Sequence, residues 1–471
     1  MISFDSLTLK MWIEQNGDFL VGGRIQKIQQ PTRRDFVLSI RKNGETKKLY
    51  VNINPQCYQV CFMSKESEAK RLIEIPQKPP MFCMLLRKYL ENAVISKVSQ
   101  PPYERILELY IETFNELSEK IYLCLAVELM GKHSNVVLYN YDTNIILGCA
   151  HNVGAEKSRE REMAGTLPYA YPPNPPKQWY VSEGTFSDDT TGDINSKIDN
   201  YYAQLIYEEK FRSTKENYRQ IINRRLKKDK NSLEKMEYKL EKEKDCNKYR
   251  RTADLIMANI YNNKDYSRFI RVFDWENNKE ISIELDETKT LKDNANNFYK
   301  LYNKGKNSKT KLSELSEELR MEIDYLEQIL YSIELAESME DFSQIEFEIE
   351  PEKEKKSDKK SIEPLKLTIY GHDVFVGRNN RQNDYIVSKL SKDEDYWFHT
   401  KDCAGSHVLL KCENPSNSLV LECAKIAKQY SKASESSKVG VIYTKRKNLK
   451  KPPKANLGYV TYKGEKEILV P

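Results

Sequence analysis

The sequence predicts an α+β multidomain protein, and three observations carry that prediction. The first 150 residues alternate strand-like and helix-like segments, and the middle of the chain holds two long stretches with heptad repeats. Residues 365–471 return to strand and helix patterns and carry 19 Lys+Arg against 11 Asp+Glu. With 471 residues the chain can form several domains. We expect two α+β end domains joined by a long antiparallel coiled-coil hairpin with a small insert at its tip.

The N-terminal domain is expected to span residues 1–180. Pro79–Pro80 precede an amphipathic run, which predicts a helix over 81–92. Runs rich in β-branched and aromatic residues predict strands at 37–40, 48–53, 106–111, 121–129 and 136–139. A Pro-rich segment closes the domain, and residues 181–204 are predicted to be a short polar connector.

Two helical arms are expected in the middle of the chain. Leu226, Leu233 and Leu240 recur every seven residues in the first arm, 205–251, and a second seam of apolar residues runs through 292–340. At 1.5 Å per residue each arm would be about 70 Å long. Residues 252–291 are predicted to form a tip insert with one helix and one β-hairpin. Residues 341–364 are rich in charge and are predicted to be a flexible linker.

The basic C-terminal domain, residues 365–471, contains the aromatic run around Trp397 and His399, followed by His407. Basic charge attracts phosphate, and aromatic rings and imidazoles can stack on bases. This combination favours RNA as the ligand, although Trp397 could equally be a core residue. The first helical arm carries 16 Lys+Arg against 9 Asp+Glu, which fits either a solvated helix face or RNA contact.

Several classes of protein are disfavoured. The N-terminus lacks the pattern of a secretory signal, and no apolar run reaches the length of a membrane span, so we expect a cytoplasmic protein that binds no membrane. The nine Cys form no CxxC pair. No P-loop or GxSxG motif is present. His399, Cys403 and His407 are spaced by four, but no fourth ligand is evident, so neither a metal nor another cofactor is expected.

Two motifs in the N-terminal domain carry candidate binding residues. Glu104 and Arg105 form an adjacent carboxylate and guanidinium, which fits a surface salt bridge or a phosphate contact in which the carboxylate orients the arginine. Gly131 follows a predicted strand and precedes four polar residues, including Lys132 and His133. A glycine turn that displays such side chains together is typical of a phosphate- or RNA-binding loop.

Several segments together resemble the NFACT family of proteins. The resemblance covers nearly the whole chain, with these segments in the family's order: 22–25, 79–88, 128–135, 376–384, 397–399, 405–407 and 430–433. It implies a ribosome-associated quality control factor that binds the large ribosomal subunit and its rRNA when peptidyl-tRNA obstructs that subunit. Bacterial members recruit alanyl-tRNA and add an alanine tail that marks the stalled chain for degradation. The ribosome catalyses peptide bond formation, so the protein itself would position tRNA and would not be an enzyme.

The resemblance also assigns site residues. Asp5 matches the family's N-terminal acidic position, although alone it would also suit a helix cap. Glu104 and Arg105 match an Asp-Arg pair, so a glutamate replaces the aspartate here, and Lys132 and His133 are expected to assist them in binding tRNA. In the C-terminal domain Arg378, Trp397, His399 and His407 are expected to bind RNA. A compact helix-hairpin-helix domain, usual in the family before the first arm, is expected to be missing.

Two alternatives stay open at this point. The replaced aspartate and the missing helical domain would also fit a subunit-bound scaffold that does not direct tailing. A surface adhesin that binds fibronectin is the other alternative, and the absence of a secretion signal disfavours it.

Overall fold

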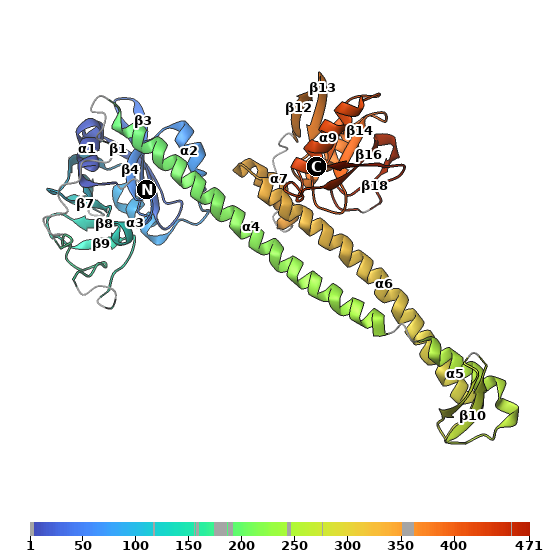
Figure 1. Cartoon of the computed structure of the whole chain (residues 1–471). Helices are drawn as coiled ribbons and strands as arrows, with labels where there is room; N and C mark the ends of the chain where they lie inside the picture. Colours follow the sequence, from blue (N-terminus) through green and yellow to red (C-terminus); the bar gives the residue numbers. More distant parts are fainter. Residues whose placement is uncertain are drawn as a thin grey trace. The chain divides into compact units, whose positions relative to one another are not determined.

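The computed structural model describes residues 4–115, 118–154, 156, 160–173, 186, 192–242, 246–275, 277–350, 362–453 and 455–471. The chain divides into two compact units, Met1–Arg212 and Ser213–Pro471, and the division falls inside one long helix. The α+β multidomain class predicted from the sequence is confirmed, with sheets in both units and two long helices (Figure 1).

The first unit is built on a nine-stranded antiparallel sheet with the strand order β4-β3-β2-β1-β5-β6-β7-β8-β9. The strands are β1 Arg24–Gln29, β2 Asp35–Lys42, β3 Glu45–Asn52, β4 Gln59–Met63, β5 Val94–Ser99, β6 Ile106–Phe114, β7 Lys120–Glu128, β8 Asn135–Asn140 and β9 Ile146–Cys149. The helices are α1 Ser6–Leu20, α2 Lys65–Arg71 and α3 Met81–Leu90. The five predicted strands and the helix after Pro80 therefore all form.

Both faces of the sheet are buried around β7, whereas β1 has exposed residues between its buried ones. In β7, Leu123, Leu125 and Val127 belong to the main core, whereas Cys124 and Ala126 belong to a smaller core on the other face. This alternation follows from the two-residue period of a strand. Because β7 is covered on both faces, it provides a firmly packed support for the turn that follows it.

The prediction that residues 181–204 form a polar connector is wrong for the second half of this segment. Helix α4 already begins at Ile194 and extends to Lys242. Ile194, Ile198 and Tyr202 are buried in the core of the first unit. These apolar residues recur every four positions, a helical spacing, but the polar residues between them hid this spacing in the sequence. The first half of the connector lies mostly outside the described residues.

The second unit contains the predicted antiparallel helical pair. Helix α6 spans Leu291–Leu335 and runs beside the portion of α4 after Arg212 (Figure 1). Lys230 of α4 contacts Glu327 of α6 at 2.6 Å, and Glu237 contacts Arg320 at 2.6 Å. Residues later in α4 therefore contact residues earlier in α6, so the two helices are antiparallel.

The predicted seam between these helices is buried over only part of its length. Leu226, Leu326 and Ile333 are buried, whereas Leu301 and Leu315 are exposed. The tip insert contains the predicted helix and hairpin, with α5 Asn247–Ala258, β10 Phe269–Asp274 and β11 Lys279–Glu284. These elements pack their own small core against the start of α6. The predicted start of the insert at residue 252 is wrong, because α4 ends at Lys242 and α5 already begins at Asn247.

The prediction that residues 341–364 form a flexible linker is wrong for the first part of this segment. Residues Met339–Ile349 form helix α7, which begins at a capping box between Ser338 and Asp341. Phe342, Ile345 and Ile349 are buried. The high charge of this segment suggested disorder, but three apolar residues at helical spacing anchor it. Residues 351–361 lie outside the described part of the chain.

The C-terminal domain is a six-stranded sheet with the order β12-β13-β15-β14-β16-β19 and a separate β17-β18 pair. Its strands are β12 Leu365–Ile369, β13 His372–Val376, β14 Tyr396–Thr400, β15 Val408–Leu410, β16 Val439–Lys445, β17 Leu449–Lys450, β18 Thr461–Tyr462 and β19 Lys466–Val470. The helices are α8 Asn380–Tyr385 and α9 Asn417–Gln429, and a π-helical turn covers Ile386–Leu390. Among the described residues, no helix is both long and apolar enough to cross a membrane.

Candidate RNA-binding sites

A single cavity in the first unit collects all five tRNA-binding residues predicted for the N-terminal domain. Its volume is about 1440 Å³, and its lining includes Asp5, Glu104, Arg105, Lys132 and His133. These residues come from three separate segments of the chain, which the sheet brings together. Their roles stay predictions, but their shared location is what a joint binding site requires.

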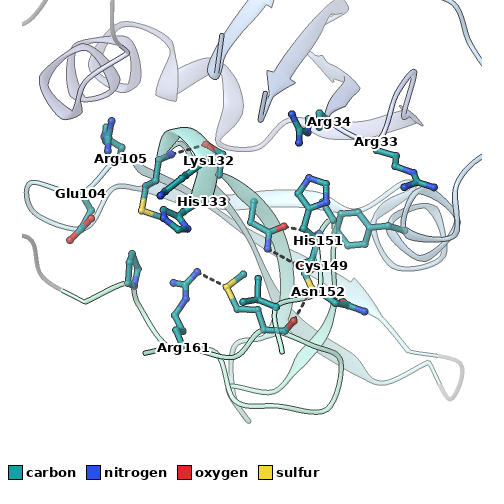
Figure 2. A pocket seen from close by; sticks show the side chains of 18 of the residues that line it. Arg33, Arg34, Glu104, Arg105, Lys132, His133, Cys149, His151, Asn152 and Arg161 are labelled. Atoms are coloured by element: carbon teal, nitrogen blue, oxygen red, sulfur yellow. Dashed lines mark hydrogen bonds between the residues drawn. The ribbon is translucent and has the colours of Figure 1, made fainter. Parts of the chain in front are cut away.

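Arg105 is held in place without a carboxylate. Its Nη1 donates a hydrogen bond to the Tyr58 hydroxyl at 3.0 Å, and its guanidinium lies 5.6 Å from the centre of the Tyr58 ring. Figure 2 shows Glu104 pointing away from Arg105, and among the described residues no ion pair joins them. Burial raises the pKa of the Glu104 carboxyl, and the neighbouring charge of Arg105 opposes that rise. The guanidinium therefore keeps donors available for a ligand.

The turn after β7 displays only part of its polar sequence. Gly131 has a φ of +63°, which suits glycine, and it opens a short 3₁₀ turn in which Lys132 and His133 are exposed. Ser134 and Asn135 are buried instead. The Ser134 hydroxyl accepts a hydrogen bond from the Met130 amide at 2.8 Å. The prediction that all four polar side chains are displayed is therefore wrong, because Ser134 bonds within the turn and the Asn135 side chain bonds to the backbone of His151.

Asp5 serves as the N-cap of α1, since its Oδ1 accepts a hydrogen bond from the Thr8 amide at 2.7 Å. Glu128, part of the same sequence motif as Lys132, is fully buried and pairs with Arg161 at 2.5 Å. Burial raises the pKa of the Glu128 carboxyl, while the bonds from Arg161 and Tyr169 favour its charged form. The role of Glu128 in the fold is to hold Arg161 beside the cavity.

Sequence reasoning missed a second group of cavity residues, Arg33, Arg34 and His151. Figure 2 shows this group on the opposite side of the cavity from Arg105, Lys132 and His133. Arg33 and Arg34 are exposed, and within the described residues neither forms an ion pair. Burial and the charges of the two arginines lower the pKa of His151, so its ring is neutral at pH 7. Two adjacent arginines shortly before the predicted strand at 37–40 were the available signal.

The C-terminal candidates lie apart from this cavity, in the second unit. Trp397 is only 2% exposed and His407 4%. Their rings meet edge to face at 5.2 Å, and the His399 ring stacks on Trp397 at 5.7 Å. Burial lowers the pKa of both histidines, so both are neutral at pH 7. The rings form a cluster as the sequence suggested, but they do not form an open stacking surface.

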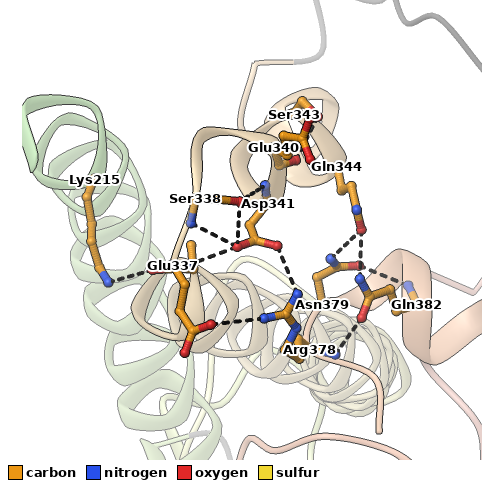
Figure 3. Close-up of polar contacts among 11 residues, drawn as sticks. Lys215, Glu337, Ser338, Glu340, Asp341, Ser343, Gln344, Arg378, Asn379 and Gln382 are labelled. Carbon is orange, nitrogen blue, oxygen red and sulfur yellow. Dashed lines mark hydrogen bonds and ion pairs between the residues drawn. The ribbon is translucent and has the colours of Figure 1, made fainter. Parts of the chain in front are cut away.

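Arg378 contacts the end of α6 and the start of α7. Its guanidinium pairs with Asp341 at 3.2 Å and with Glu337 at 3.4 Å (Figure 3). Gln344 of α7 accepts hydrogen bonds from Asn379 and Gln382, each at 2.9 Å. We call this set of contacts the α7 interface. Arg378 is therefore engaged inside the protein, which does not favour its predicted role in RNA binding.

Comparisons with known proteins agree with this architecture. Residues 5–187 and 178–363 match the family model described as NFACT N-terminal and middle domains, and residues 366–464 match the model of the NFACT protein RNA binding domain. The fold and these matches define a multidomain protein with an RNA-binding domain at its C-terminal end. The chain belongs to the NFACT family.

Two curated relatives span the whole chain. The Rqc2 homolog RqcH of Bacillus subtilis is 26% identical over 564 aligned positions, covering 100% of this chain and 98% of the relative. The Rqc2 homolog RqcH of Streptococcus pneumoniae is 26% identical with the same coverage. The alignments are longer than this chain, so the relatives contain segments that it lacks. A solved structure, the C-terminal of the fibronectin/fibrinogen-binding protein from Streptococcus suis, is 26% identical and covers 55% of this chain and 94% of that chain, with a TM-score of 0.43.

Proposed function

We propose that this protein is a ribosome-associated quality control factor that binds obstructed large ribosomal subunits and recruits alanyl-tRNA for alanine tailing. The proposal rests on the relatives named Rqc2 homolog RqcH, on the RNA-binding domain, and on one structural observation. That observation is the cavity of the first unit, which is lined by the five predicted residues and also by Arg33 and Arg34. Among the described residues, neither of these two arginines forms an ion pair with a carboxylate.

The cavity suits an RNA ligand for electrostatic reasons. Arg33, Arg34, Arg105 and Lys132 line it from two sides, and such unpaired cations attract phosphate. Tyr103 is 67% exposed and Met81 90% exposed in the same lining, and both offer apolar faces on which an unpaired base can stack. The protein would act by holding tRNA in place, and the ribosome would form the peptide bond. Such a factor would work in the cytoplasm.

The test is to purify the full chain from its own cells at low salt and to sequence the RNA that accompanies it. We expect large-subunit rRNA and an enrichment of alanine tRNA. An Arg105→Glu variant should lose the tRNA while it retains rRNA, because a carboxylate would repel phosphate. Lys65→Glu is the matched control, since Lys65 is exposed on α2 and does not line the cavity.

A scaffold without tailing is the second candidate, and the orientation of Glu104 favours it. The carboxylate points away from Arg105, so it does not orient the guanidinium in the way that a paired acid would. Recovery of rRNA with no enriched tRNA from the unmodified protein would support the scaffold. Recovery of no RNA would contradict both candidates.

A further inference from the structure

A second cavity, of about 850 Å³, lies between α6 and the C-terminal domain in the second unit. Its floor is an aromatic cluster of Trp397, His399, His407 and Tyr462. The Tyr462 ring lies 5.8 Å from that of Trp397, and the His399 and His407 rings are 5.3 Å apart. Tyr462 is 38% exposed, so part of this cluster is open to a ligand.

Three polar groups in the lining have no hydrogen-bond partner among the residues that the structure describes. They are the Trp397 Nε1, the His407 Nδ1 and the Thr400 Oγ1, and all three side chains are more than nine-tenths buried. A buried donor or acceptor without a partner costs stability, so each such atom calls for an explanation such as a bound ligand. Three of them around one cavity indicate that the site is built to receive a ligand with polar atoms.

The charge of the lining identifies what kind of ligand this is. Five carboxylates line the cavity, and its described lining contains neither lysine nor arginine; the acids are Glu318, Glu322, Asp324, Glu327 and Asp402. Glu327 is paired with Lys230 and Lys432. The other four form no ion pair with any described residue. Burial and the charge of Glu327 raise the pKa of Asp324, while the charge of Lys230 opposes that rise.

This arrangement opposes RNA and favours a cation. A phosphate placed among unpaired carboxylates would be repelled, whereas an ammonium or guanidinium would be attracted. Aromatic rings reinforce the preference, because a cation over a ring face is stabilised by the ring quadrupole. The neutral histidines add no opposing charge. The expectation that Trp397, His399 and His407 face RNA therefore does not suit the electrostatics of this cavity.

We propose that this cavity binds a lysine- or arginine-bearing segment of a partner protein. The cationic side chain would lie over the aromatic cluster with its charge at Glu322 and Asp324, and a backbone carbonyl of the segment would accept a hydrogen bond from Trp397. The volume is sufficient for a few residues of an extended chain. This site is separate from the RNA-binding cavity of the first unit, so the two ligands do not compete for the same groups.

The cavity exists only while the C-terminal domain is docked on α6, which provides much of the lining. Gln328 of α6 secures this docking through two hydrogen bonds with Gly405. Its Nε2 donates to the Gly405 carbonyl at 2.8 Å, and its Oε1 accepts from the Gly405 amide at 2.9 Å. A bound segment touches both walls and would therefore stabilise the docked arrangement.

The test measures binding of fluorescent probes to the full chain by anisotropy. The probes are a short peptide of alternating lysine and glycine, its glutamate–glycine counterpart, and a short oligouridylate. We expect the lysine peptide to bind in a salt-dependent way. The variant Glu318→Gln/Glu322→Gln/Asp324→Asn should bind it about tenfold more weakly, because it removes three rim charges with little change in shape.

The matched control is Glu280→Gln/Glu284→Gln/Glu287→Gln, which removes the same charge from exposed positions of the tip insert. It should bind the lysine peptide as the unmodified protein does. A Tyr462→Leu variant separates the aromatic contribution and should also weaken binding. Equal loss in the rim and control variants, or no binding of the lysine peptide, would overturn the proposal. It would also be overturned by oligouridylate binding that depends on Tyr462.

Discussion

Arg71 and Asp199 form a fully buried ion pair that joins α2 to the first turns of α4. The Nη1 of Arg71 lies 2.6 Å from the Oδ1 of Asp199, and the two side chains are 0% and 3% exposed. The other carboxylate oxygen of Asp199 accepts a hydrogen bond from the Ser64 amide at 2.9 Å. Together with the buried Ile194, Ile198 and Tyr202, this pair anchors the start of α4 in the first unit.

Removing one member of this pair should be strongly destabilising. Arg71→Met leaves the Asp199 carboxylate buried without its counter-charge, and we expect the free energy of unfolding to fall by about 3–5 kcal/mol. Adding Asp199→Asn should restore part of that loss, since the second change removes the isolated charge. Urea unfolding of the four proteins in a double-mutant cycle measures this. Additive losses would show that the two residues are not coupled.

Arg33 and Arg34 should each contribute to the salt dependence of RNA binding. If both contact phosphate, the slope of log K against log salt concentration should become shallower by about 1.4–1.8 in Arg33→Gln/Arg34→Gln. The measurement is a salt titration of tRNA binding by the full chain. Lys65→Gln/Lys70→Gln on α2 is the control, and a similar change in slope there would contradict a specific contribution from this side of the cavity.

The α7 interface should contribute modestly to the stability of the second unit. Arg378 pairs with one well-exposed and one largely buried carboxylate, so Arg378→Ala should cost about 1 kcal/mol. Hydrogen exchange should become faster in α7 because its docking is weakened. Lys366→Ala, which removes an exposed pair with Asp373, should cost less. Unchanged exchange in α7 would show that Arg378 does not hold this helix.

Glu348 should make the second unit less stable at neutral pH than in mild acid. Its carboxyl is buried and accepts hydrogen bonds from Tyr325 and Asn380. Burial raises its pKa above the ordinary value of 4.5. Since the folded state holds the proton more tightly than the unfolded state, the stabilising contribution is complete below pH 4.5 and is lost as pH rises through the raised pKa.

The variant Glu348→Gln tests this prediction because it retains an acceptor oxygen and cannot ionise. Its stability should depend less on pH between about 5 and 8, with a gain at pH 8 of about 1.4 kcal/mol for each unit by which the pKa is raised. Urea unfolding across this pH range provides the measurement. Glu346→Gln on the same helix serves as the control. An unchanged pH profile in Glu348→Gln would show that this carboxyl does not titrate as expected.

The sequence by itself determined the elements whose periodicity is local. The alternation in β7, the Pro80 start of α3 and the heptads of α4 and α6 each depend on neighbours a few residues away. These elements all form, although α4 begins earlier than predicted and the heptad seam is only partly buried. The sequence also indicated two candidate binding residues: Arg105, which follows Glu104 in a charged pair, and Lys132, which follows the Gly131 turn. The family resemblance added Asp5. The local sequence pattern could not reveal that this residue lies in the cavity.

Only the tertiary structure decided which of these residues share a site and which face inward. Arg33 and Arg34 join the cavity because β1 and β2 lie in the same sheet as β7, a long-range arrangement without a local signature. Trp397 is buried at the floor of the second cavity, and Arg378 pairs with Glu337 and Asp341 of its own chain, two positions that the sequence alone could not show. The charged segment after α6 folds into α7 because its apolar residues are buried, with the Phe342 ring against Tyr218 of α4, a contact distant in sequence.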